Sequence, residues 1–126
     1  MKQRSTLTLL GVLLLLSAMS RQVALAADNL SPTEAANHVG ETAKVCGLIA
    51  GAKYATQVKG QPTFVNFEKD YPNQVFTALV WGNDRRHFSP PPESLVGKQV
   101  CVSGKIESYK DRPEIIVSSP GQFSDN

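Results

Sequence analysis

The chain has 126 residues, with 13 basic and 11 acidic side chains and a formal net charge of +2. Three of the basic residues and none of the acidic ones lie in the first 26 positions, so residues 27–126 carry a formal net charge of −1. These 100 residues suffice for one small domain and not for two. They also lack the excess of Lys and Arg that strong, unspecific duplex binding requires.

The first 26 residues are typical of a secretory signal peptide. Two basic residues precede the apolar block Leu7–Met19, and Ala24-Leu25-Ala26 offers an A-x-A cleavage site. The block is shorter than the roughly 20 apolar residues of a membrane span, although a retained anchor is the alternative. We therefore expect residues 1–26 to be removed and residues 27–126 to form one periplasmic or secreted domain.

The first predicted element of this domain is a short helix, Pro32–Val39. The Ser31 hydroxyl can accept a hydrogen bond from one of the first free backbone amides, and the Glu34 side chain can accept one from the Ser31 amide, which completes a capping box. Pro32 suits the first helical position. Gly40 ends the helix.

Five predicted strands follow, each short and rich in β-branched or aromatic residues. The first carries Gly47 in its middle, where a strand that bends around a small barrel often needs a glycine. A turn at Tyr71-Pro72-Asn73 joins the second and third, and a proline-rich connection with helical turns joins the third and fourth. The pattern favours a small closed barrel, which leaves few exposed edges. The predicted strands are Thr42–Ala50, Thr63–Glu68, Val75–Trp81, Lys98–Glu107 and Glu114–Ser118.

Cys46 and Cys101 are the two cysteines of the chain. An even number of cysteines in a chain bound for an oxidising compartment favours a disulfide. Two buried, reduced thiols are the alternative.

The strand pattern resembles the OB-fold, in the form seen in the anticodon-binding domains of some aminoacyl-tRNA synthetases. It is also similar to a group of small exported bacterial proteins built from this one module. The resemblance spans about residues 42–117 and is more specific for the fold than for a function. The segments that carry it are Lys44-Val45-Cys46-Gly47 with Ile49, Gly60–Phe67, Val75–Val80, Val100–Ile106 and Pro113–Val117.

The resemblance implies a pairing for the cysteines. The first and fourth strands of an OB-fold are neighbours, and alternation places Cys46 and Cys101 on the outward faces of these strands. A cross-strand disulfide is then sterically possible.

The resemblance also implies a binding face on the second and third strands. It places Phe64 outward, at the base-stacking position of the synthetase domains, with Val65 and Phe67 inward. Phe76 is the expected outward partner on the third strand, near a position where those domains carry a base-reading polar residue. Trp81 is expected in the core.

Flanking loops are expected to surround this face with aromatic and basic side chains, as a nucleic-acid groove requires. Lys53, Tyr54 and Lys59 lie on one side, and Tyr109, Lys110 and Arg112 on the other. Glu107, Asp111 and Glu114 offset most of the second group. The alternative is that the aromatic residues pack the protein and the lysines form a solvated rim.

No catalytic motif is recognisable in the sequence. The short basic run Asp84–His87 could hold an anion, but a solvated turn is the commoner explanation. His38 and His87 lack zinc-ligand spacing. We therefore expect no enzymatic activity, no cofactor and no metal.

Two functions are consistent with these observations. The first is an exported module that binds single-stranded nucleic acid or oligonucleotides, with Phe64 and Phe76 as the stacking platform. The alternative is a protein-interaction or envelope-structure module without a nucleic-acid ligand. An exported nuclease is disfavoured because the sequence offers no recognisable catalytic set.

Overall fold

The computed structural model describes residues 29–126, so the predicted signal peptide lies outside the described residues. The strands within this range are β1 (Thr42–Tyr54), β2 (Thr63–Phe67), β3 (Phe76–Val80), β4 (Gln99–Tyr109), β5 (Arg112–Ile116) and β6 (Phe123–Asp125). The helical segments are short: η1 (Glu34–Asn37), α1 (Gly82–Arg85), η2 (Pro92–Leu95) and η3 (Pro120–Gln122).

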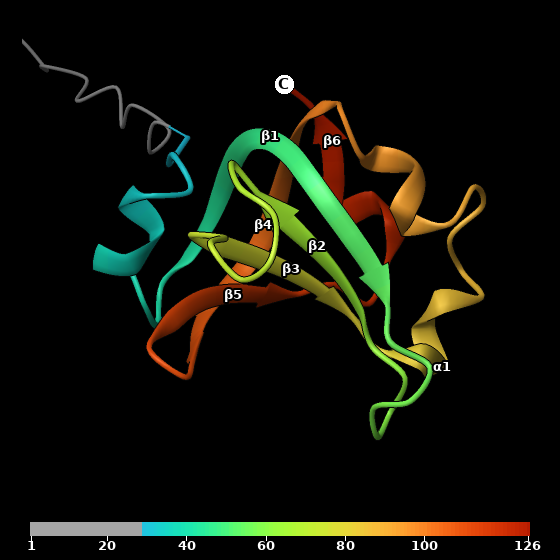
Figure 1. The fold of residues 1–126 in the computed structure, drawn as a ribbon. Helices are drawn as coiled ribbons and strands as arrows, with labels where there is room; N and C mark the ends of the chain where they lie inside the picture. Colours follow the sequence, from blue (N-terminus) through green and yellow to red (C-terminus); the bar gives the residue numbers. More distant parts are fainter. Residues whose placement is uncertain (1–28) are drawn as a thin grey trace, which may run out of the picture.

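Five of the strands close into a ring (Figure 1). β1 pairs with β2, β2 with β3, β3 with β5, β5 with β4, and β4 again with β1. All of these pairs are antiparallel except β3 with β5. The predicted five-stranded barrel is thereby confirmed, together with the short N-terminal helix and the helical turns between β3 and β4.

A sixth strand, β6, is missing from the sequence-based prediction. It pairs antiparallel with β4, and Phe123 lies opposite Val102. Phe123 is the one apolar residue of the three in β6, so no alternation in the sequence distinguishes this strand from a polar tail. The preceding η3 is held by a capping box between Ser119 and Gln122.

β1 is shared between two partners. Residues 42–48 pair with β4, and residues 49–54 pair with β2. An irregularity between Ile49 and Gly51 adds one residue to β1 and exchanges its inward and outward faces. Gly47 permits a close approach, because a Cβ there would lie 2.6 Å from the side chains of Pro32 and Glu68. This is a more specific reason for the glycine than the predicted bend.

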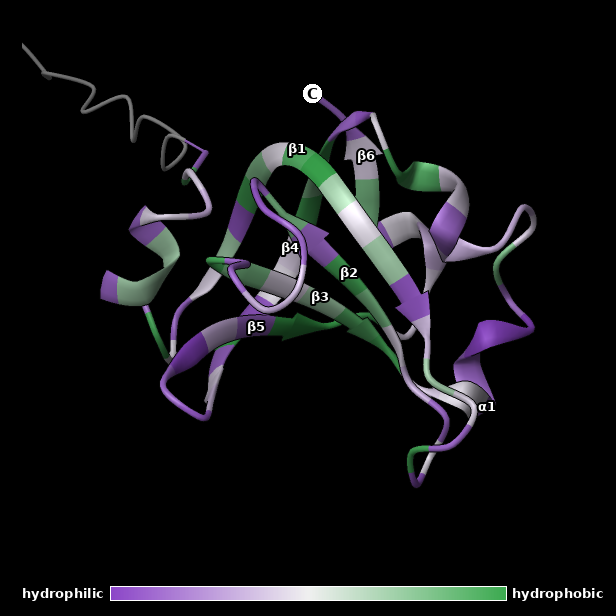
Figure 2. Ribbon diagram, in the orientation of Figure 1, coloured by the Kyte–Doolittle hydropathy of each residue, from purple (hydrophilic) through white to green (hydrophobic). Residues whose placement is uncertain are grey.

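The barrel interior is filled by apolar side chains from every strand of the ring. Phe67 and Phe76 are its two largest fully buried side chains, and they meet edge-on, with ring centroids 5.1 Å apart and an interplanar angle of 77°. Figure 2 shows apolar residues concentrated on the strands and hydrophilic residues in the β4–β5 hairpin. The other fully buried core residues include Val45, Ile49, Val65, Ala78, Val80, Val102, Ile106, Ile115 and Val117.

The N-terminal helix is shorter than predicted. Its capping box is present, since the Glu34 amide donates to Ser31 Oγ at 3.2 Å and the Ser31 amide donates to Glu34 Oε1 at 3.4 Å. After Asn37 the chain turns toward the barrel, and the Gly40 amide donates to the Ile106 carbonyl at 2.8 Å. Ala35 is fully buried against the core.

The predicted disulfide is confirmed. Cys46 and Cys101 lie directly opposite each other on β1 and β4, with an S–S distance of 2.01 Å. The bond spans 55 residues and joins the two strands whose pairing closes the ring. Cys101 is buried although it lies on the outward side of β4.

Replacing both cysteines with alanine is expected to lower the free energy of unfolding by about 2–4 kcal/mol, because the open chain gains loop entropy when it unfolds. Urea unfolding of the native protein and of the double variant measures the difference. A reductant should lower the stability of the native protein and leave the double variant unchanged. Equal stability of the two proteins without reductant would contradict the expectation.

Candidate functional site

The outer face of the barrel carries a row of largely apolar side chains. Phe64 on β2 lies opposite Lys53 on β1 and Leu79 on β3, and Leu79 lies opposite Ile116 on β5. Successive residues of a strand point to opposite faces, and Val65, next to Phe64, is fully buried in the barrel. These four residues therefore share the outside of the barrel, and we call them the outer row.

Exposure differs along the outer row. Ile116 is 36% exposed and Phe64 is partly exposed, whereas Leu79 between them is only 5% exposed. Lys53 is exposed at the β1 end. The row thus offers a small apolar surface with one lysine beside it.

A polar row runs parallel to the outer row, two residues away from it on β1, β2, β3 and β5. The register aligns Gly51, Asn66, Thr77, Glu114 and Glu107 across β1, β2, β3, β5 and β4. Thr77 Oγ1 donates to Asn66 Oδ1 at 3.1 Å. We call these five residues the polar row.

The loop between β2 and β3 adds a carboxylate to this face. Asn66 Nδ2 donates to Asp70 Oδ1 at 3.2 Å, and a Cβ on Gly51 would lie 2.2 Å from that carboxylate. Gly51 therefore makes room for Asp70 over β1. In Figure 1 the loop passes across the face of the sheet, and its Tyr71 is 75% exposed.

Two carboxylates meet at the other end of the polar row. Glu114 on β5 lies directly opposite Glu107 on β4. Burial raises the pKa of Glu114 above its ordinary value, and the neighbouring Glu107 carboxylate raises it further. The outer face is therefore acidic on this side.

The raised pKa of Glu114 gives a prediction about stability. The native state holds the Glu114 proton more tightly than the unfolded state does, so ionisation of Glu114 at neutral pH lowers the free energy of unfolding. This cost declines as the pH falls through the native pKa of Glu114 and is gone below the pKa of the unfolded state. Glu114→Gln should raise the free energy of unfolding at pH 7 by up to about 1 kcal/mol, and the gain should vanish below about pH 4.

Urea unfolding of native and Glu114→Gln protein between pH 3 and pH 8 measures this effect. Glu107→Gln serves as the comparison, because it removes the repulsion and leaves the burial of Glu114 in place, and it should give a smaller gain. A Glu114→Gln variant that is less stable than the native protein at pH 7 would contradict a raised pKa of Glu114 in the native state.

The predicted outward position of Phe76 is wrong. Phe76 is fully buried and lies opposite Phe67, so both rings point into the barrel. All five residues of β3 are buried, which hides the alternation of its two faces in the sequence. The outward residues of β3 are Thr77 and Leu79. The face therefore has one aromatic side chain from β2 and β3, Phe64.

The expected core position of Trp81 is also wrong, since Trp81 is 39% exposed. It immediately precedes α1, and its ring packs beside Gly60, where a Cβ would lie 3.0 Å from the indole. The ring covers the β1–β2 loop and does not fill the barrel.

The first predicted group of flanking residues is divided by the structure. Lys53 lies beside Phe64, but Tyr54 faces the other way and stacks under Arg85, whose guanidinium carbon lies 3.8 Å from the ring centroid. Arg85 also pairs with Glu93 and donates to Thr63 Oγ1 at 2.8 Å. Tyr54 is thus part of the end of the barrel.

The Arg85–Glu93 pair accounts for one residue of the basic run Asp84–His87, whose Arg86 and His87 are exposed. The hydrogen bond of this pair holds the pKa of Arg85 above its ordinary value and the pKa of Glu93 below its own. Arg85 therefore joins α1 to η2 and is already paired with a carboxylate. Lys59 lies in the exposed loop between β1 and β2.

The second predicted group lies at the tip of the β4–β5 hairpin. Tyr109 and Arg112 are paired across the strands, and Lys110 Nζ lies 5.4 Å from the Tyr109 ring centroid. These residues are exposed. Along β4 and β5, Glu107 and Glu114 lie between this group and the outer row. The structure therefore places Lys53 with Phe64 but separates both from Tyr109, Lys110 and Arg112.

Leu79, Ile116 and Asp70 belong to this face and are missing from the sequence-based prediction. Counting outward positions from Glu114 would have identified Ile116. The position of Asp70 follows from the fold of the β2–β3 loop, and no local sequence pattern indicates it.

Comparison of the chain with profiles of protein families, with curated proteins and with solved structures finds no match. Within residues 29–126, no cluster of three or more His, Cys, Asp or Glu side chains is arranged to hold a metal ion. No helix in the same range is long and apolar enough to cross a membrane.

Proposed function

We propose that this chain is an exported protein-interaction module whose contact surface is the outer row. The observation that carries this proposal is the register of β2, β3 and β5, which aligns Phe64, Leu79 and Ile116 on one outward surface. Phe64 and Ile116 are exposed or partly exposed on either side of the nearly buried Leu79. Such apolar side chains suit the centre of a small protein interface, and the neighbouring polar row suits its rim.

The charges on the same face favour a protein partner over a polyanion. Glu107 and Glu114 belong to the polar row and Asp70 contacts Asn66 of this row, so a nucleic-acid backbone would approach three carboxylates closely. Single-strand binding also relies on successive aromatic rings, whereas Phe67 and Phe76 are buried and Phe64 is the one aromatic ring on the outer face of β2 and β3.

Binding of single-stranded nucleic acid is the second candidate. The observation that favours it is the direct pairing of Lys53 with Phe64, which places a cation beside the one stacking ring. The resemblance to synthetase anticodon-binding domains supports the same function. One stacked base contributes roughly 1–3 kcal/mol, so such binding would be weak.

The disulfide indicates an oxidising compartment outside the cytoplasm. We place the protein in the periplasm or among secreted proteins, because its first 26 residues are typical of a signal peptide. A partner in the envelope or outside the cell then fits both the compartment and the charge of the face.

Phe64→Ala and Ile116→Ala are expected to reduce retention of a partner from an envelope extract by about tenfold, because each removes a central apolar contact. Immobilised native and variant proteins are compared by quantitative mass spectrometry of what they retain. Val58→Ala is the matched control, since Val58 is 49% exposed in the β1–β2 loop and lies off this face.

Fluorescence anisotropy with labelled single-stranded oligonucleotides at low salt distinguishes the two candidates. The protein-interaction proposal predicts no oligonucleotide binding up to high micromolar protein. Oligonucleotide binding that is lost in Phe64→Ala and in Lys53→Ala would instead establish the second candidate and contradict the first.

A further inference from the structure

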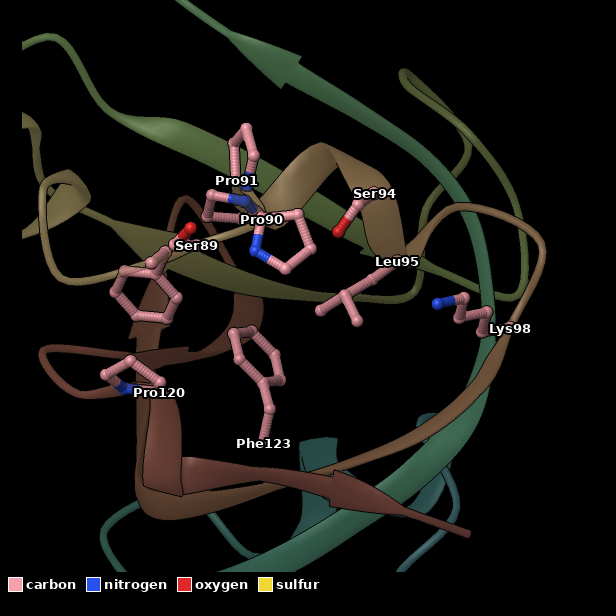
Figure 3. A pocket seen from close by; sticks show the side chains of 10 residues that line it. Ser89, Pro90, Pro91, Ser94, Leu95, Lys98, Pro120 and Phe123 are labelled. Atoms are coloured by element: carbon pink, nitrogen blue, oxygen red, sulfur yellow. The ribbon is translucent and has the colours of Figure 1, made fainter.

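A hollow of about 260 Å³ lies on another part of the molecule, between the proline-rich connection and the C-terminal segment. Figure 3 shows Leu95 of η2 on one side of the hollow and Phe123 of β6 pointing toward it from the other. Phe123 also meets Phe88 edge-on, with ring centroids 6.2 Å apart. Pro90 and Pro120 complete its apolar walls.

The lining of this hollow is chemically divided. Ser94 and Lys98 lie on the Leu95 side, whereas Pro120 lies on the far side (Figure 3). The Lys98 backbone is held firmly, since its carbonyl accepts from the Ile49 amide at 2.9 Å and its amide donates to the Leu95 carbonyl at 3.0 Å. A cation and a hydroxyl thus stand at the rim of an apolar depression.

Lys98 is available for an anion from outside the chain. It is exposed, and within residues 29–126 it forms no ion pair. A carboxylate on Lys98 would therefore not have to displace an existing partner from it.

A second hollow of about 200 Å³ adjoins the first and shares Leu95, Lys98 and Phe123 with it. Its other lining residues include Ser124 and Asp125 of β6. In the described sheet β6 is the terminal strand and pairs only with β4. A strand with one free edge can pair with an extended peptide. The depression thus continues beside a strand able to bind backbone.

We propose that these two hollows bind the C-terminal end of an extended partner peptide, with its last, apolar side chain in the first hollow against Leu95 and Phe123. Its terminal carboxylate binds Lys98. The residue before it is basic and faces Asp125, while the peptide backbone follows β6. Four neighbouring features indicate such a peptide: the apolar hollow, Lys98, Asp125 and the free edge of β6.

The same features favour a peptide over a free organic acid. A small apolar acid would use the first hollow and Lys98 only, and it would leave Asp125 and the edge of β6 without a role. A chain terminus uses all of them. This surface includes no residue of the outer row, so variants of the two surfaces can be tested separately.

The test uses fluorescein-labelled hexapeptides that end in arginine and leucine, measured by anisotropy with the disulfide-bonded protein. Converting the free carboxylate to an amide, or changing the protein by Lys98→Glu, should weaken binding about tenfold, as expected for loss of a charge-assisted hydrogen bond. Lys105→Glu is the matched control, because Lys105 is an exposed lysine further along β4, and it should leave binding unchanged.

A second comparison tests the basic residue of the peptide. Replacing the arginine of the peptide with glutamate should weaken its binding to the native protein about fivefold. The Asp125→Lys variant should bind this glutamate peptide as well as the native protein binds the arginine peptide. N-acetyl-leucine should compete only at a concentration at least tenfold higher than the unlabelled peptide.

Three results would overturn the proposal. The first is the absence of peptide binding up to about 1 mM. The second is an equal effect of Lys98→Glu and Lys105→Glu. The third is competition by N-acetyl-leucine as strong as competition by the peptide, which would assign the hollow to small organic acids.

Discussion

The division of β1 between β4 and β2 is the constraint on which the rest of the structure depends. Its first part closes the ring against β4, where the Cys46–Cys101 bond joins the two strands. Its second part pairs with β2 after the irregularity that follows Ile49. Because this irregularity exchanges the faces of β1, Lys53 points outward beside Phe64 and Tyr54 turns toward Arg85. One inserted residue thus decides which side chains can share a surface.

The resulting surfaces differ in chemistry. The outer row is a short apolar strip bordered by carboxylates, which suits a protein partner better than a polyanion. The hollow beside β6 combines an apolar depression with Lys98 at its rim and a free strand edge. Both surfaces are small. The outer row is set on strands that the closed ring holds in register, and the hollow lies beside β6, which pairs with β4 of the ring. We infer that the barrel serves as a rigid support for short contact surfaces.

The sequence predicts the barrel well because its first and fourth strands alternate clearly and its turns carry glycine and proline. The disulfide follows from the compartment and from the neighbouring positions of the first and fourth strands. The position of Phe76 could not be predicted in this way, since both faces of β3 are covered and no alternation marks its inner face. β6 has only Phe123 as an apolar residue, and the place of Asp70 depends on how the β2–β3 loop folds.

β2 and β3 contribute one aromatic ring to the outer face and two to the core. The free energies of unfolding of Phe64→Ala and Phe76→Ala, measured side by side in urea, test this arrangement most directly. The structure predicts a loss of about 3–5 kcal/mol for Phe76→Ala, which empties a fully buried site. It predicts a loss within about 1 kcal/mol for Phe64→Ala. Equal losses, or a larger loss for Phe64→Ala, would contradict this arrangement of the rings.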